Sequence, residues 1–187
     1  PENAVKTFAA AKERLAKSSP GANIVICGRV DISSQETWSL TDADGNFTNS
    51  EGETWQPVIQ RYREYYADYL ANVLNNGDLT MENLVLDGNS DSVLESTKKD
   101  PSGLICGAQD SKIVLASGTV LRNQKAQDAV KFGGALYTNG EAEIQKGALI
   151  TDCSNKSEPI VWVEGTTAKG GSLTLCGEIK DCTVSSE

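Results

Sequence analysis

The feature that most constrains the fold is a repeat of about 30 residues, in which short apolar groups alternate with turns. The stretch GGALYTNGEAEIQKGALITDCSN, at 133–155, shows one copy, and each of its apolar groups is closed by Gly, Asn or Asp. The apolar residues of these groups are Leu136, Ala142, Ile144, Ala148 and Ile150. The groups are too short for helices, and the turn residues recur too regularly for disorder. The pattern is typical of one coil of a solenoid.

Four copies of the repeat align on their last apolar residue. The copies are LTMENLVLDGN (79–89), IVLASGTVLRN (113–123), AEIQKGALITD (142–152) and LTLCGEIKD (173–181), and the aligned residues are Leu86, Leu121, Ile150 and Ile179. Shorter apolar strands that end in turns lie between these copies and before the first, at 25–28, 72–77, 103–107, 134–140 and 160–165. We therefore expect four full units after a partial first one.

The content of the repeat selects among the known solenoids. Leucine-rich repeats require a spacing that is absent here, and helical repeats need segments that these Gly-rich, β-branched stretches do not provide. A parallel β-helix fits, because each segment pairs with its equivalent one coil away, at about 4.8 Å, and like side chains stack into ladders. Asn and Asp at the corners tolerate a left-handed backbone. We predict an all-β fold, a right-handed parallel β-helix solenoid of about five coils.

The chain is expected to form a single domain over 1–187, in three parts. Residues 1–20 would form an N-terminal cap, because 3–17 shows helical apolar spacing and Asn3 can cap its first turn. Such a helix would cover the open core of the first coil. Residues 37–69 form an aromatic-rich excursion, and 70–187 are regular coils. Since no comparable helix follows the last coil, we expect the sequence to be a piece of a longer protein.

The composition argues against several classes of function. The chain has 187 residues, with 17 Lys and Arg against 26 Asp and Glu and a net charge of −9, which disfavours binding to nucleic-acid phosphates. No histidine is present, so the usual general base and the commonest metal ligand are missing. No run of about 18 apolar residues predicts a membrane span. The five cysteines form no C-x-x-C pair, leave at least one unpaired and do not indicate a disulfide framework.

Several segments resemble the right-handed parallel β-helix regions of large cell-surface proteins of Gram-positive bacteria, within the pectin-lyase-like fold group. The segments are VICGRV (25–30), the Trp-containing excursion, PVIQRY (57–62), LTMENLVLDGN (79–89), GGALYTNG (133–140) and GSLTLCG (171–177). The resemblance covers nearly the whole chain from about Gly21. It implies an adhesin-like or scaffold module with an N-terminal cap helix. The enzymes of the group place acidic residues with Arg, Lys or His on a solvent-facing groove, and this chain departs from their hydrolases by its lack of histidine.

The acidic stretch DADGNFTNSEGE, at 42–53, is a candidate calcium site. Its oxygen-bearing residues follow an EF-hand-like spacing, and the candidate ligands are Asp42, Asp44, Asn46 and Glu53, together with Thr48 and Ser50. Phe47 occupies the position where such a loop requires Gly. The alternative interpretation is a solvated turn rich in Asp, Asn and Gly.

The excursion holds seven of the 11 aromatic residues and is a candidate ligand platform. The candidate residues are Trp38, Trp55, Tyr62 and Tyr65. Exposed rings of this kind stack on sugars. The alternative, which we favour, is that these rings pack inward and hold the long loop in place.

A column of polar residues is expected on successive coils. The alignment stacks Asn123, Asp152 and Asp181, with Arg122 and Lys180 in the neighbouring column beside Asp87 and Thr151. Lyases of the resembling fold group use stacked acids with calcium and a basic residue, which makes Arg122, Asp152 and Asp181 the candidate catalytic set. The alternative is the ordinary turn chemistry of β-helix corners.

Two pairs of cysteines align between coils. Cys153 and Cys182 fall one coil apart, which is within the reach of a disulfide. The alternative is a pair of buried or half-buried thiols that pack as small apolar groups. Cys27 and Cys106 also align, but two coils apart, which is too far for a bond.

The expected function is a noncatalytic, extracellular β-helix module that acts as an adhesin-like surface or a rigid scaffold. Its partners would be glycans or surface proteins, without nucleic acid, and it needs no cofactor unless calcium binds. The alternatives are a polysaccharide lyase, or an inactive relative of one, and a carbohydrate-binding module that uses the 37–69 loop.

Overall fold

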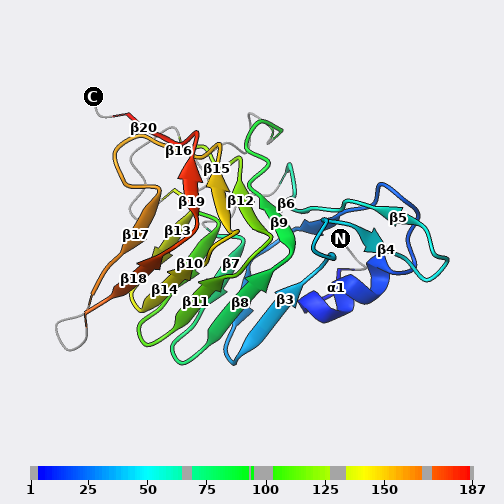
Figure 1. Cartoon of the computed structure of the whole chain (residues 1–187), viewed down its shortest axis with the longest axis horizontal. Helices are drawn as coiled ribbons and strands as arrows, with labels where there is room; N and C mark the ends of the chain where they lie inside the picture. The colour runs from blue at the N-terminus through cyan, green and yellow to red at the C-terminus, as the bar shows by residue number, and fades with distance from the viewer. Residues whose placement is uncertain are drawn as a thin grey trace.

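The computed structural model describes residues 4–64, 69–92, 94, 103–126, 134–165 and 170–185, and shows a parallel β-solenoid of about four turns with one short helix (Figure 1). The elements in chain order are α1 (Phe8–Leu15), β1 (Ile24–Ile26), β2 (Val30–Ile32), β3 (Glu36–Ser39), β4 (Phe47–Thr48), β5 (Thr54–Trp55), β6 (Ile59–Arg61), β7 (Ala71–Val73), β8 (Asp78–Glu82), β9 (Leu84–Asp87), β10 (Ile105–Gly107), β11 (Lys112–Leu115), β12 (Thr119–Arg122), β13 (Leu136–Thr138), β14 (Glu141–Ile144), β15 (Leu149–Thr151), β16 (Ser154–Asn155), β17 (Val161–Val163), β18 (Ser172–Leu175), β19 (Glu178–Lys180) and β20 (Thr183–Val184). The predicted fold class is confirmed.

Three parallel sheets form the walls of the solenoid. Sheet A has the order β1-β6-β9-β12-β15-β19, sheet B has β17-β13-β10-β7-β2, and sheet C has β18-β14-β11-β8-β3. The chain visits sheets B, C and A in turn, so each strand pairs with its equivalent in the next coil. Two separate two-stranded sheets accompany the three walls. They are the parallel pair β16–β20 and the antiparallel hairpin β4–β5. The expected count of about five coils included the partial first coil. The hairpin β4–β5 interrupts this first coil between β3 and β6.

The predicted aliphatic ladder lies in sheet A. Leu86, Leu121, Ile150 and Ile179 are paired in one file by the strand register, which confirms the alignment of the repeat. The file continues through Ile59 to the first coil. Leu86, Leu121 and Ile150 are fully buried, so the ladder forms the interior of the solenoid. Stacking of identical side-chain shapes at the spacing of paired strands gives each coil the same cross-section as the next.

The corner after sheet A has a left-handed residue in each of the last three coils. Asn123, Asp152 and Asp181 have φ of 55°, 51° and 52°. Asn and Asp adopt this region more readily than other residues with a side chain, because their short polar groups bond to nearby backbone. The predicted stack of these three residues therefore exists, and its first role is to turn the chain.

The N-terminal end of the solenoid is covered by α1, as expected, but the helix is shorter than the predicted 3–17. It begins after Thr7, whose side chain accepts a hydrogen bond from the Ala10 backbone N–H at 3.2 Å. Asn3, the predicted cap, lies outside the described residues. The ring of Phe8 stacks on Trp38 with centroids 5.0 Å apart, which fixes the helix over the first turn. Figure 1 shows the helix at the end of the sheets beside β3.

The aromatic excursion is also shorter than the predicted 37–69. Trp38 belongs to β3, a regular rung of sheet C, and Ile59 belongs to β6, a regular rung of sheet A. Between β3 and β6 the chain leaves the solenoid, and this connection carries the hairpin β4–β5. Phe47 and Trp55 meet edge to face across this hairpin with centroids 5.2 Å apart. β3 and β6 are short strands in which alternate residues are buried, as in the other strands of the coils. The residues at the two ends of the predicted excursion therefore belong to regular coils.

The predicted alignment of the first coil is wrong. Residues 25–28 were expected to match the strands of sheet B, whereas β1 pairs with β6 in sheet A, and β2 is the first strand of sheet B. Cys27 and Cys106 are therefore not equivalent, since Cys106 aligns with Asn72 and Asp31. The error arose because the apolar runs of β1 and β2 have the same pattern, and only pairing distinguishes them.

One large polar side chain lies inside the solenoid. Arg61 is fully buried at the end of β6. Its guanidinium donates to the carbonyl oxygens of Gly88 (3.3 Å) and Gly103 (3.1 Å) and to the side-chain oxygen of Gln124 (3.5 Å). These bonds connect three successive coils at one corner, and they offset the cost of taking the charge out of water.

Replacement of a ladder residue should cost far more stability than replacement of its outward neighbour. Leu121→Ala removes buried methyl groups and leaves a cavity between two rungs, and we expect a loss of about 2–5 kcal/mol in the free energy of unfolding. Val120→Ala, on the outer face of the same strand, should cost about 1 kcal/mol or less. Urea denaturation followed by circular dichroism measures both, and equal losses would contradict the assigned faces of β12.

Candidate functional site

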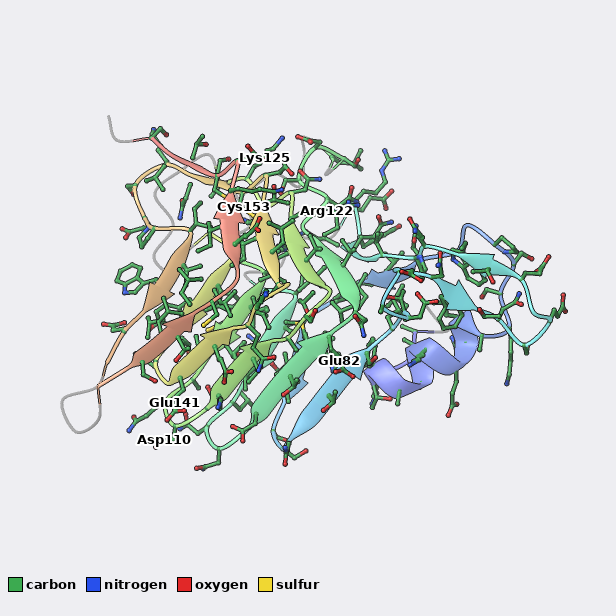
Figure 2. The ribbon with its side chains drawn as sticks, in the orientation of Figure 1. Glu82, Asp110, Arg122, Lys125, Glu141 and Cys153 are labelled. Atoms are coloured by element: carbon green, nitrogen blue, oxygen red, sulfur yellow. The ribbon has the colours of Figure 1, made fainter. Side chains whose placement is uncertain are left out.

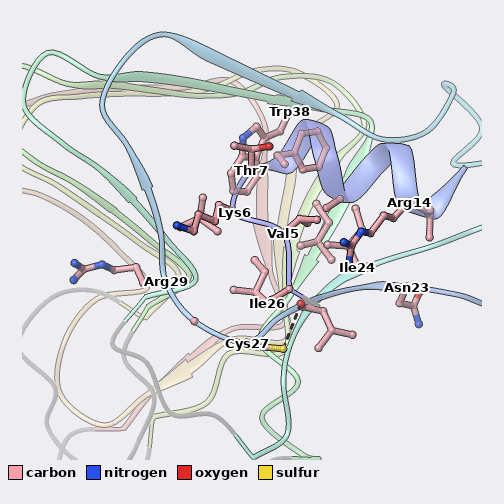
Figure 3. Close-up of a pocket in the computed structure, with 18 of the residues that line it drawn as sticks. Val5, Lys6, Thr7, Arg14, Asn23, Ile24, Ile26, Cys27, Arg29 and Trp38 are labelled. Atoms are coloured by element: carbon pink, nitrogen blue, oxygen red, sulfur yellow. Dashed lines mark hydrogen bonds between the residues drawn. The ribbon is translucent and has the colours of Figure 1, made fainter. Parts of the chain in front are cut away.

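Two surfaces have the shape or chemistry of a binding site. The first is a pocket of about 620 Å³ between α1 and the first coil (Figure 3). The apolar side chains that line it include Val5, Phe8, Leu15, Ile24, Ile26 and Trp38. The pocket exists because a helix lies across the end of the sheets and cannot fill the space above β1 completely.

Among the residues that the structure describes, the charged side chains that line this pocket are those of Lys6, Arg14 and Arg29 (Figure 3). Arg29 is in an exposed ion pair with Asp31, with Nε–Oδ1 at 2.7 Å. Cys27 donates from its thiol to the Val25 carbonyl at 3.8 Å. A pocket with apolar and basic lining residues suits a ligand that has an apolar part and a negative charge.

The second surface is the outer face of sheet B. The strand register places one column of outward residues along it: Asp31, Asn72, Cys106, Tyr137 and Trp162. Tyr137 and Trp162 meet edge to face, with centroids 6.0 Å apart and an interplanar angle of 88°. Tyr137 is only 6% exposed, so the accessible ring of the column is that of Trp162, which shares the column with amide, carboxylate and thiol groups on a rigid sheet.

The hydroxyl group of Tyr137 orients a carboxylate at one end of the column. It donates to Oε2 of Glu164 at 2.8 Å. Burial and the neighbouring carboxylate both raise the pKa of Tyr137, so the phenol remains a donor at neutral pH. Burial likewise raises the pKa of the Cys106 thiol, against the smaller effect of a hydrogen bond with Tyr69. These groups can bind a polar ligand, but they hold their protons too firmly for acid–base exchange near neutral pH.

The residues of the candidate catalytic column have structural partners in and beside sheet A. Arg122, on the outer face of sheet A, is paired with Asp87 on the preceding coil, with Nε–Oδ2 at 2.7 Å (Figure 2). Asp87 is 8% exposed and also accepts from the Asn89 backbone N–H (2.7 Å) and the Asn123 side chain (3.2 Å). Asp152 accepts from the Thr151 hydroxyl at 3.0 Å. The strand register brings these columns together on successive coils, and the contacts described here are those of turns and of an ion pair.

The candidate calcium stretch forms two turns, one at 42–46 before β4 and one at 49–53 between β4 and β5. Oδ1 of Asp42 accepts from the backbone N–H groups of Asp44 (3.0 Å) and Asn46 (2.8 Å), and Glu53 accepts from the Asn49 side chain (3.0 Å). In the part of the chain that the structure describes, no three His, Cys, Asp or Glu side chains are close enough to share a metal ion. The alternative interpretation of this stretch, a turn, is the one that the structure supports.

The candidate aromatic platform is divided between the interior and the surface. Trp38 is 1% exposed, and the indole N–H of Trp55 donates to the Ala22 carbonyl at 2.8 Å. Tyr62 donates to Glu64 at 3.1 Å, and this bond raises the Tyr62 pKa. Tyr65 lies outside the described residues. Trp38 is therefore an interior residue of a rung, and Trp55 holds the excursion to the segment before β1; both rings pack inward, as the favoured alternative expects.

Cys153 and Cys182 lie on adjacent coils as free thiols. The Cys153 thiol donates to the Thr151 carbonyl at 3.2 Å, and burial raises its pKa to about 12, with a smaller contribution from Cys182. Two free thiols on adjacent coils match the alternative of packed thiols. The disulfide between Cys153 and Cys182 stays a prediction.

Tyr137 and Trp162 were not among the predicted site residues. Their strands, LYT and VWV, were recognised as strands, but the sequence alone does not show which alternate residues face outward. The sequence signal that could have identified them is the aromatic residue at the centre of each strand. The register of sheet B places these two residues side by side.

The buried thiol should be protected from alkylation. Cys176 is exposed, whereas Cys153 is buried and stays protonated up to a pH of about 12. We expect iodoacetamide at pH 8 to modify Cys176 first and Cys153 only after denaturation, as read by peptide mass spectrometry.

The raised pKa of the Cys153 thiol also predicts how the free energy of unfolding changes with pH. The thiol has an ordinary pKa of 9.0, so between about 9 and about 12 it ionises in the unfolded chain and not in the folded one. The free energy of unfolding should fall across this window, and Cys153→Ala should make the fall smaller. An equal fall in the two proteins would contradict the burial of this thiol.

Within the described residues, no helix has the length and apolar character needed to cross a bilayer. In the comparisons with known proteins, the chain matches no protein-family model, no curated protein and no solved structure at a significant level.

Proposed function

We propose that this chain is a noncatalytic, extracellular binding module, in which a rigid β-solenoid presents a carbohydrate-binding face on the outside of sheet B. The single observation that carries this proposal is the contact of Tyr137 with Trp162, with Glu164 held at 2.8 Å by the tyrosine hydroxyl.

The chemistry of the column matches the surface of a sugar. A pyranose ring has C–H groups on its faces, which pack on aromatic rings, and hydroxyl groups at its edge, which bond to carboxylates and amides. Trp162 offers a partly exposed ring, and Glu164 and Asn72 offer the polar groups. The column runs along the solenoid axis, so an extended chain of sugars would contact several coils at once.

The solenoid supports binding because it holds these side chains in place before the ligand arrives. The strands β10, β13 and β17 are paired without interruption, and the interior behind them is closely packed. A pre-ordered face loses little conformational entropy on binding. This is also what a scaffold requires, and the adhesin-like role is in keeping with the resemblance to bacterial surface proteins.

The noncatalytic part of the proposal is supported by the partners of the candidate acids and bases. Arg122 is engaged by Asp87, and Asp152 by Thr151. The absence of histidine from the sequence removes the commonest general base. The extracellular part rests on the family resemblance alone.

A glycan array with the purified chain, followed by calorimetry on any sugar that binds, tests the proposal. Trp162→Ala should weaken binding by about tenfold or more, because loss of an aromatic contact at the centre of a site typically costs more than 1 kcal/mol. Tyr62→Ala is the matched control, an aromatic residue outside the column. Circular dichroism must show that both variants remain folded.

Two outcomes would contradict the proposal. The first is an array with no bound glycan. The second is binding that survives Trp162→Ala and is lost in Tyr62→Ala, which would assign the site to the excursion instead.

A further inference from the structure

We propose that Cys153 and Cys182 are the site of a redox-controlled disulfide between adjacent coils, which closes the coil that carries Trp162 into a covalent ring. The inference concerns a modification site and its effect on one coil, and it does not depend on the proposed carbohydrate ligand.

The strand register places the two cysteines opposite each other. Each cysteine is the second of two residues that lie between one paired position and the next, so Cys153 and Cys182 are equivalent on adjacent coils. The flanking pairs are Thr151 with Lys180 and Ser154 with Thr183.

The backbone leads into both cysteines with the same conformation. The residue before each of them is left-handed, with φ of 51° at Asp152 and 52° at Asp181. The Thr183 backbone N–H donates to the Cys153 carbonyl at 3.0 Å, which holds the two coils together at this position. Equivalent residues on paired parallel strands are about 4.8 Å apart, and their side chains point the same way. This separation lies within the Cα range of about 4.4–6.8 Å that a disulfide needs.

The two thiols interact directly. Cys153 is 1% exposed, and Cys182 packs against the same buried core. Burial is the main cause of the raised pKa of Cys153, and the charge of Cys182 and its hydrogen bond with Cys153 raise it further. The Cys153 thiol donates to the Thr151 carbonyl at 3.2 Å, and the Cys182 thiol donates to the Ile150 carbonyl at 3.9 Å. A thiol is a weak donor, so a disulfide gives up little when these bonds are lost.

The arrangement is specific to this pair. The other three cysteines are aligned with residues of different types on adjacent coils, namely Cys27 with Tyr62, Cys106 with Asn72 and Tyr137, and Cys176 with Gln145. In the part of the chain that the structure describes, no other two cysteines are equivalent on adjacent coils.

Formation of the bond requires a small-molecule disulfide as the oxidant. The S–H bonds of both cysteines break, and one S–S bond forms between their Sγ atoms. The two electrons reduce the S–S bond of the small molecule, which takes up the two protons and leaves as two thiols. Exchange of this kind passes through a mixed disulfide and is reversed by an excess of thiol. The ring is therefore closed under oxidising conditions and open under reducing ones.

The bond acts on one coil of the solenoid. It closes a loop of about 30 residues, which contains β16, β17, β18 and β19 and therefore Trp162. A crosslink over such a loop removes conformational freedom from the unfolded chain. Each coil of a solenoid is held mainly by its neighbours, so a coil can open before the rest unfolds. The disulfide should oppose both global unfolding and this local opening.

Peptide mass spectrometry under non-reducing conditions tests whether the bond forms in the folded chain. After incubation with oxidised glutathione, the peptides that contain Cys153 and Cys182 should be found linked, with the loss of two hydrogen atoms. Dithiothreitol should separate them again. Cys176 is exposed and serves as the internal control, since it should give only a mixed disulfide with glutathione.

Melting and amide hydrogen exchange test what the bond does. The oxidised form should melt about 5–10 °C above the reduced form. The amides of β17, β18 and β19 should exchange at least about tenfold more slowly. Cys153→Ala and Cys182→Ser should each remove the difference between the two forms, whereas Cys176→Ser, the matched control, should keep it. Each variant is compared with its own reduced form, so a loss of stability from the substitution itself does not affect the result.

Three results would overturn the proposal. A folded chain that yields no linked peptide with oxidised glutathione shows that the thiols are not placed for a bond. Linkage that forms only in urea assigns the bond to the unfolded chain. A linked chain with unchanged melting and unchanged exchange shows that the bond does not hold the coil.

Discussion

The parallel pairing of each strand with its equivalent one coil away is the interaction on which the rest of the structure depends. It sets the distance between rungs and forces equivalent residues into files. In sheet A the file runs through Leu86, Leu121 and Ile150, all fully buried. A ladder of this kind has no single centre, because each coil is stabilised mainly by its two neighbours. Interior residues must therefore repeat, whereas outward residues are free to vary.

That freedom explains where the candidate functions lie. The outer face of sheet B carries Tyr137 and Trp162, and the outer face of sheet A carries the ion pair of Arg122 with Asp87. Both use positions that the ladder does not constrain. At the corners the constraint is on the backbone, and Asn123 and Asp152 serve it through their left-handed conformation. Asn and Asp at such corners therefore have a structural role of their own.

The first turn of the solenoid is closed by a helix instead of by another coil. α1 covers the interior there through Phe8, and the space that it leaves becomes the pocket beside β1. A helix can shield an apolar end in this way, although it does not extend the ladder or pair with strand edges.

The sequence by itself determined the period, the interior ladder and the corners, because these follow from local alternation and from the recurrence of like residues. It did not determine the register of β1 and β2, since two neighbouring apolar runs have the same pattern until one is paired. It also did not distinguish Trp38, which is buried in a rung, from Trp162, which faces outward. Nor did it indicate that Arg61 would lie inside, bonded to the carbonyls of other coils. These features rest on contacts between residues distant in sequence, so only the tertiary structure decides them.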